Sequence, residues 1–177
     1  MNQVIPLHDD ALPEHLRGRY QLQDCSMTLA EGLEEYFRVN PGLDDPREIE
    51  DPRAAHYFTC HDTCHVIFGT HTGDLDEGCN DTYTVFGVDL PWWQYIGGYL
   101  ATEQSKSITM YYLKWETLRT IWNSILLIPA VWRLARAMKR KWPWEPTEEM
   151  YQRPINELRQ EYGIQVLHPQ ALLDARS

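Results

Sequence analysis

The stretch from Asp51 to Glu77, DPRAAHYFTCHDTCHVIFGTHTGDLDE, decides the fold and supplies the chemistry of this chain. Asp51 followed by Pro52 is a strong start signal, because aspartate caps the first turn of a helix and proline suits its first position. Gly69 is a good stop signal, since glycine readily adopts the left-handed conformation that ends many helices. The sequence therefore predicts a helix over residues 52–68.

Four groups that can bind a divalent cation follow one another in this stretch: His61, Asp62, His65 and Glu77. At about 3.6 residues per turn, His61, Asp62 and His65 share an arc of roughly 100° on a helix. If residues 70–73 reverse the chain, Glu77 returns to the same point. We therefore predict a four-ligand metal site on two helices, and we expect the same residues to carry any catalysis. Asp62 has an alternative role, which is to accept a hydrogen bond from the free N–H of a ligating imidazole.

The donor set restricts the identity of the cation. Two imidazoles with one or two carboxylates suit Zn²⁺, which we expect first, with Fe²⁺ or Mn²⁺ as alternatives. Mg²⁺ fits less well, because it prefers oxygen ligands. His71, in the predicted loop, is either a fifth ligand, a proton shuttle or a solvated loop residue, and the pattern favours the last of these.

Two other classes of metal enzyme fit the same stretch less well. A protease of the HExxH type needs a glutamate where Asp62 stands, because the longer side chain acts as the general base. A phosphohydrolase built on a His-Asp pair needs a further His and Asp on separate helices. His56 is on the same predicted helix as the pair His61-Asp62. Asp74 and Asp76 lie closer to that pair in the sequence than the second Asp of such enzymes usually does. The sequence disfavours both classes.

The rest of the chain predicts one all-α domain. Its 177 residues are 43% hydrophobic, which is enough for a single core, and no segment alternates as a half-buried strand does. The expected organisation is an irregular N-terminal arm over residues 1–26, one helical domain over 27–168 and a C-terminal tail over 169–177.

Further helices are expected from capping and apolar spacing. Thr28-Leu29-Ala30-Glu31 is a capping box, and Asp45-Pro46 is an additional start signal. The expected helices cover about residues 29–39, 74–86, 105–141 and 154–163, with a kink at Pro129 and a further stretch that opens at Pro91.

Charge and hydrophobicity exclude some partners and locations. The formal net charge of -10 argues against nucleic acid as a partner. Residues 1–10 show no signal peptide, and the longest charge-free apolar run, residues 120–132, is shorter than the ~20 residues that span a bilayer. We expect a cytoplasmic protein with four buried free cysteines. Peripheral contact with the inner face of the membrane, through Trp142, Trp144 and residues 139–141, is an open alternative.

The sequence resembles the Coq-four family of ubiquinone (coenzyme Q) biosynthesis proteins, as a divergent and short member. That family carries His-Asp-x-x-His, about eleven residues and then Glu, which this chain matches at His61, Asp62, His65 and Glu77. The segment Arg153–Ile164, RPINELRQEYGI, is similar to the family's C-terminal segment.

The resemblance implies an all-helical bundle in which a hydrophobic tail-binding pocket lies beside a metal site. It implies a prenylated or other long-chain aromatic intermediate as ligand, and decarboxylation or oxidative decarboxylation as the reaction. A non-catalytic scaffold that binds lipid or prenylquinone is the alternative. Other quinone-biosynthesis enzymes, a membrane surface and a second copy of the chain are the partners it implies. The apolar residues of 105–141 either line the pocket or form an ordinary buried helix.

Overall fold

The computed structural model describes residues 12–13, 15–43, 45–101 and 115–169, with only the backbone given for residues 99 and 115–123. Across these ranges the regular structure is helical, and β pairing is limited to two isolated bridges. The prediction of an all-α fold is confirmed. The α-helices are α1 (Leu29–Val39), α2 (Pro52–Phe68), α3 (Asp74–Gly87), α4 (Trp92–Leu100), α6 (Trp115–Ala137), α7 (Glu148–Tyr151) and α8 (Ile155–Tyr162); the 3-10 helices are η1 (Arg19–Gln21) and η2 (Pro46–Glu48).

The ends of α1 and α2 follow the sequence signals. The Thr28 hydroxyl accepts a hydrogen bond from the N–H of Glu31 at 3.2 Å, and the Glu31 carboxylate accepts one from the N–H of Thr28 at 2.8 Å. The Asp51 carboxylate accepts a backbone N–H of the first turn, and Pro52 is the first residue of α2. Gly69 ends α2 with a φ of 78°, a left-handed conformation that side chains other than glycine rarely adopt. Both predicted helix starts and the predicted stop are confirmed.

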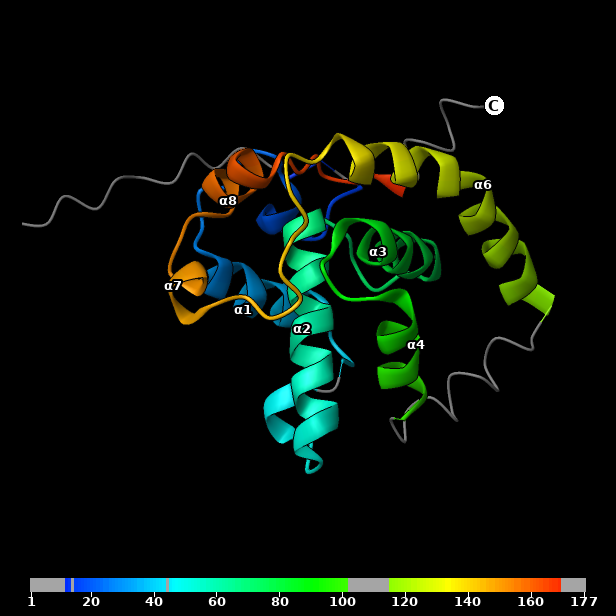
Figure 1. The fold of residues 1–177 in the computed structure, drawn as a ribbon, viewed down its shortest axis with the longest axis horizontal. Helices are drawn as coiled ribbons and strands as arrows, with labels where there is room; N and C mark the ends of the chain where they lie inside the picture. Colours follow the sequence, from blue (N-terminus) through cyan, green and yellow to red (C-terminus); the bar gives the residue numbers. More distant parts are fainter. Residues whose placement is uncertain (1–11, 14, 44, 102–114, 170–177) are drawn as a thin grey trace, which may run out of the picture.

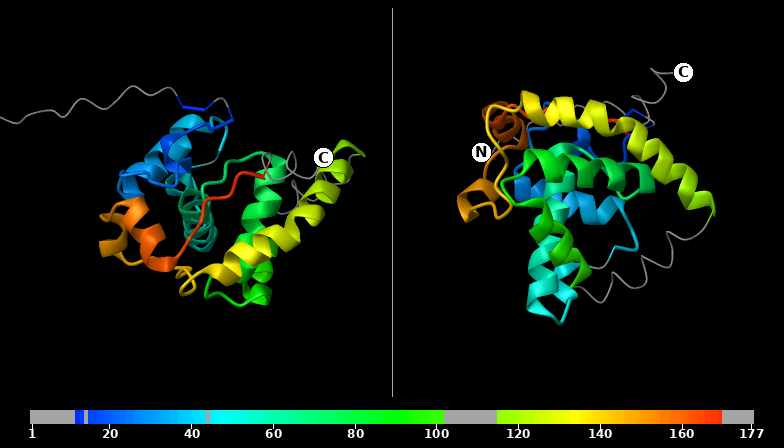
Figure 2. Two further views of the ribbon diagram at one scale, coloured as in Figure 1. Left: turned by 90° about the horizontal axis from the view of Figure 1, so that it is seen from above. Right: turned by 45° about the vertical axis from the view of Figure 1, so that its right-hand side comes forward.

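The central helix is α2 (Figure 1), which contacts α1, α3, α4 and both 3-10 helices. The longest helix, α6, packs along α3, and the two remain side by side in the views of Figure 2. After α8 the chain returns to α2, where the N–H of Leu167 donates to the carbonyl of Phe68 at 2.9 Å. The stretch quoted at the outset therefore links most of the elements, although the first turns of α2 project beyond them in Figure 1.

The end of α6 differs from the sequence-based expectation. We expected this helix to run to Lys141, but it ends at Ala137. The backbone N–H groups of Lys139 and Trp142 donate to carbonyls at the ends of α8 and α3, each at 2.8 Å, so they are not available for a continuing helix. The first part of the expected segment, residues 105–114, lies outside the described residues.

Two proline signals have different outcomes. Pro129 lies inside α6, and the helix axis changes direction along its length in Figures 1 and 2, as expected for a residue without a backbone N–H. Asp45 and Pro46 start only the three-residue 3-10 helix η2. A longer helix does not fit there, because Asp51 already caps the start of α2.

Trp142 and Trp144 are core residues, which corrects the alternative that placed them at a membrane surface. Their exposed fractions are 0% and 7%. Trp142 pairs with Val88 in one of the two isolated bridges, so the connection after α6 is held against the end of α3. The neighbouring ammonium groups of Lys139 and Lys141 donate to backbone carbonyls at 2.7 and 3.1 Å. The segment from Lys139 to Trp144 therefore packs against the core, and the two tryptophans do not form a membrane-facing surface.

The C-terminal segment with the family-like pattern ties the N-terminal residues to α2. Backbone hydrogen bonds of 2.8–3.0 Å run from Leu29 to Arg153, from Ile155 to Met27 and from Asn156 to Cys25. The fully buried Arg159 donates to the carbonyls of Tyr20, Leu22, Val66 and Ile67. The helix α8 then ends at Gly163, with a φ of 73°. The segment Arg153–Ile164 thus has a structural role.

The described surface carries apolar side chains mainly on two helices. The exposed large ones are Trp92, Trp93, Ile96 and Leu100 on α4, Ile125, Leu126, Ile128 and Trp132 on α6, and Phe86 on α3. Among the described helices, none combines the length and hydrophobicity required to cross a bilayer. All four cysteines are buried and unpaired, as expected.

Candidate metal centre

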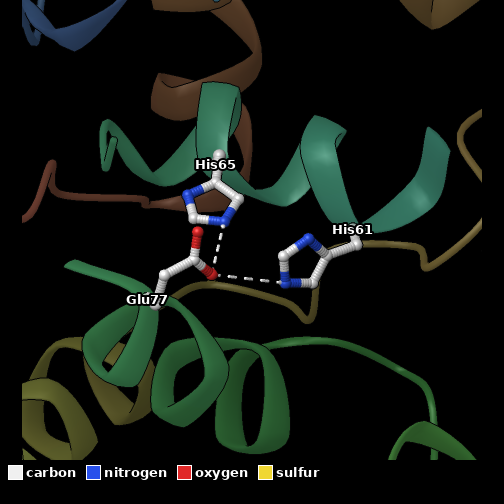
Figure 3. Close-up of side chains that lie close together, drawn as sticks. All are labelled: His61, His65 and Glu77. Atoms are coloured by element: carbon white, nitrogen blue, oxygen red, sulfur yellow. Dashed lines mark ion pairs between the residues drawn. The ribbon is translucent and has the colours of Figure 1, made fainter. Parts of the chain in front are cut away.

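Three of the predicted ligands meet between α2 and α3 (Figure 3). His61 and His65 are one turn apart on α2, and Glu77 comes from the first turn of α3 after the short loop at residues 69–73. Glu77 Oε2 lies 3.2 Å from His65 Nε2 and 3.9 Å from His61 Nε2. One ligand atom from each residue lies within 4.8 Å of the others, so the three form a group that could hold a metal ion.

Hydrogen bonds around His65 determine which ring nitrogen carries its proton. The Thr70 hydroxyl donates its one hydrogen to Asn80 Oδ1 at 3.2 Å, so its oxygen accepts a hydrogen bond from His65 Nδ1 at 2.9 Å. In a neutral imidazole the other nitrogen, Nε2, then has a free lone pair. This buried Nε2 has no hydrogen-bond partner among the described residues, and it points at the Glu77 carboxylate.

The spacing of these electron-rich atoms fits a cation between them. At 3.2 Å the carboxylate needs positive charge opposite it, which a proton on His65 Nε2 or a cation between the two atoms would supply. Ligands held about 2.0–2.1 Å from a tetrahedral Zn²⁺ lie roughly 3.3 Å apart. His65 and Glu77 already have that spacing, whereas His61 Nε2, 3.9 Å from Glu77 Oε2, would have to move closer. The residues present therefore fit a divalent cation.

Asp62 lies outside the group of three. Its carboxylate is buried, and Oδ1 is 3.6 Å from His61 Nδ1, the ring nitrogen opposite the one that faces Glu77. Burial raises the pKa of Asp62, although the nearby imidazoles oppose this. This position suits the alternative role in which Asp62 orients the imidazole and leaves Nε2 for the metal.

The carboxylates around His61 attract positive charge. Burial alone would lower the pKa of His61, but Asp62, Asp81 and Glu77 outweigh it and hold the pKa well above its usual value. Burial alone would raise the pKa of Glu77, whereas His65 and His61 bring it below the usual value. A proton on His61 supplies the positive charge that the carboxylates attract, and a divalent cation would compete with that proton for Nε2.

His71 braces the loop and does not join the metal group. Its Nδ1 accepts a hydrogen bond from the N–H of Gly73 at 2.9 Å, and its Nε2 lies 3.3 Å from Asp76 Oδ2. The ring is 19% exposed, and burial lowers its pKa to about 4. The expectation of a solvated loop residue is therefore wrong. With both ring nitrogens engaged, His71 is not placed as a fifth ligand either.

Three polar residues at the centre were missed by sequence reasoning: Thr70, Asn80 and Asp81. Asp81 lies one helical turn after Glu77, and this i, i+4 spacing could have revealed it. Thr70 directly follows the glycine that ends α2. This position gave only a weak indication that the Thr70 hydroxyl would turn back toward His65. Asn80 had no sequence signal, because its contact depends on how α3 faces the loop.

Replacing Thr70 with valine is expected to weaken Zn²⁺ affinity by about 10–100-fold. Valine has nearly the same shape, but it leaves His65 Nδ1 without an acceptor and so frees the ring from its fixed tautomer. Isothermal titration calorimetry measures the change. Thr82→Val is the control, because within the described part of the chain the Thr82 hydroxyl donates to the Gly78 carbonyl of its own helix and to no group of the metal centre. An unchanged affinity in Thr70→Val would contradict the role given to the hydroxyl.

Comparison of the chain with profiles of known protein families, with curated proteins and with solved structures found no match in any of the three. The distances and hydrogen bonds of the chain itself therefore carry the assignment of a candidate metal centre. They support a metal-binding group at His61, His65 and Glu77 without identifying the metal.

Proposed function

We propose that this chain is a metal-dependent protein of ubiquinone-type biosynthesis that binds a prenylated aromatic intermediate and catalyses its decarboxylation, including the oxidative form. The observation that carries the metal dependence is the buried Nε2 of His65, which faces the Glu77 carboxylate at 3.2 Å with His61 beside them. The two sequence segments that resemble the Coq-four family support the pathway: the spacing from His61 to Glu77, and the ending Arg153–Ile164.

The site has a closed side and an open side. The His65 side chain is 0% exposed, whereas those of His61 and Glu77 are 14% and 26% exposed, so a substrate would approach past His61 and Glu77. A cation held there would supply Lewis acidity for a carboxylate or phenolate of the substrate ring. Asp62 and Thr70 would keep the two imidazoles oriented while substrate binds.

The proposed reaction bears on the choice of metal. Zn²⁺ suits the donor set and plain decarboxylation, in which carbon dioxide leaves and a proton takes its place on the ring. In the oxidative form, a hydroxyl replaces the carboxyl group, which leaves as carbon dioxide; water supplies the hydroxyl oxygen, and dioxygen accepts the two electrons and becomes hydrogen peroxide. Zn²⁺ does not change its oxidation state, so this form favours Fe²⁺ or Mn²⁺, or a ring rich enough in electrons to react with dioxygen directly.

The helix α4 connects the site to an apolar surface. The Tyr95 ring lies against His61, with 6.4 Å between the ring centroids, while Trp92, Trp93 and Ile96 of the same helix are exposed. We place the prenyl tail of the substrate along this surface, and also any contact with the inner face of a membrane that holds such substrates. Exposed apolar area of this kind commonly marks a binding surface.

The proposed activity is tested with purified protein loaded with Zn²⁺, Fe²⁺ or Mn²⁺ and given a prenylated hydroxybenzoate, in air and without oxygen. Release of carbon dioxide by at least one loaded form, and none by metal-stripped protein, is the expected result. Oxygen-dependent gain of a ring hydroxyl would identify the oxidative form. Tight binding of the substrate without turnover under all conditions would contradict catalysis and leave the scaffold alternative.

A further inference from the structure

Asp81 stands beside the metal centre on its solvent-facing side. It lies one turn after Glu77 on α3, so the two carboxylates share a face of that helix. Asp81 Oδ1 is 3.6 Å from His61 Nε2, the same ring nitrogen that faces Glu77. The Asp81 side chain is 52% exposed, so burial does not force it into this position.

A hydrogen bond from another helix holds the Asp81 carboxylate in place. The Tyr95 hydroxyl of α4 donates to Asp81 Oδ1 at 2.5 Å. Tyr95 is 6% exposed, and its ring packs against Tyr57 and Trp144, at centroid distances of 5.9 and 5.5 Å. An exposed carboxylate ordinarily samples several rotamers. Here a tyrosine anchored in the core directs one of its oxygens toward His61.

A carboxylate at this position would compensate part of the charge of a bound divalent cation. Two neutral imidazoles and the Glu77 carboxylate would leave one unit of positive charge uncompensated. Asp62 lies at the opposite side of the His61 ring, near Nδ1, whereas Asp81 lies on the Nε2 side, where the cation would bind. A carboxylate a few ångströms from a cation attracts it, and because the Asp81 side chain is 52% exposed, this attraction should weaken as salt is added.

We propose that Asp81, positioned by Tyr95, is the second carboxylate of the metal centre, which balances the charge of the cation from outside the group of three ligands and raises its affinity. Asp81 does not belong to that group, because its oxygen is close to His61 Nε2 but not to the whole set. This inference rests on the metal binding proposed above for His61, His65 and Glu77.

The test compares Zn²⁺ affinity, by competition with a chromophoric chelator, in the unaltered chain and in three variants. Asp81→Asn keeps the shape and removes the charge, so the affinity falls by about 10–100-fold. Tyr95→Phe leaves the charge and removes one hydrogen bond, so the affinity falls by roughly 2–10-fold. Glu157→Gln, which removes an exposed carboxylate on α8, leaves the affinity unchanged. The deficit of Asp81→Asn shrinks at about 1 M salt, where charges are screened within roughly 3 Å.

Each result decides between defined alternatives. Affinity within about twofold of the unaltered chain in Asp81→Asn, with Zn²⁺ binding otherwise intact, overturns the inference and leaves the proposed function standing. An equal loss in Glu157→Gln also overturns it, because the effect would then be one of net charge. Absence of Zn²⁺ binding by the unaltered chain removes the proposed function itself. If metal-free Asp81→Asn unfolds at a lower temperature than the unaltered chain, its affinity is not informative. The affinity of Tyr95→Phe and its dependence on salt then test the inference, and an unchanged Tyr95→Phe affinity overturns it.

Discussion

Replacing Glu77 with glutamine is expected to lower the affinity for Zn²⁺ by more than about 100-fold, beyond the loss expected for groups that only support a ligand. Glutamine has the same length, but it removes the one carboxylate that lies near both imidazole Nε2 atoms, at 3.2 and 3.9 Å. The two imidazoles that remain cannot by themselves hold the cation in a closed site. Metal content read by element and calorimetric titration both measure this loss.

The side chain at position 77 is 26% exposed, so the glutamine variant should keep the helical content of the unaltered protein. Circular dichroism checks this directly. Asp74→Asn is the matched control, because it removes a carboxylate from the first turn of the same helix, outside the group of three. Stoichiometric Zn²⁺ retained by Glu77→Gln at the affinity of the unaltered chain would end the assignment of this site.

The largest loss of stability is expected from Arg159→Met, which should reduce the free energy of unfolding by about 4 kcal/mol or more. The buried guanidinium donates to the carbonyls of Val66 and Ile67, in the last turn of α2, where helical carbonyls have no partner of their own. It also donates to the carbonyls of Tyr20 and Leu22. Methionine would leave these buried acceptors unpaired, at about 1–3 kcal/mol each. That loss is a large part of a typical stability of about 5–15 kcal/mol.

Burial lowers the pKa of Arg159 to about 10, so the guanidinium remains charged at neutral pH. Urea denaturation of the metal-free protein measures the change in stability. Arg153→Met is the matched control. Its guanidinium forms an ion pair with Glu161, and the two side chains are 32% and 34% exposed. Ion pairs that reach solvent in this way contribute about 1 kcal/mol or less to stability. A cost for Arg159→Met no greater than that of the control would refute its role at the end of α2.

Much of the local structure was accessible from the sequence, because the deciding contacts lie within a few residues of each other. The capping box at Thr28 and Glu31, the Asp51-Pro52 start and the Gly69 stop each act inside one helical turn. The pairing of His61 with His65 is equally local, since residues four apart share a helix face. The short loop before α3 then allowed Glu77 to be placed opposite them.

The roles of Asp62 and Asp81 show where this reasoning fails. Adjacent residues on a helix are turned by about 100° from each other, so Asp62 reaches the far nitrogen of His61 and not the point where Glu77 arrives. Asp81 is distant in sequence from His61, yet its Oδ1 lies 3.6 Å from His61 Nε2, the nitrogen that faces Glu77, because α3 packs beside α2. Proximity in sequence therefore did not indicate the carboxylate that lies on the Nε2 side of His61.

The sequence by itself determined the starts of α1 and α2, the stop at Gly69 and the candidate ligands His61, His65 and Glu77, because caps and helical spacing are local properties. Only the tertiary structure decided that Trp142 is core, that the Thr70 hydroxyl lies 2.9 Å from His65 Nδ1 and that Arg159 donates hydrogen bonds to the carbonyls at the end of α2. Each of these depends on the direction of a side chain and on the distance between segments far apart in the chain, which helix packing sets and a local pattern does not contain.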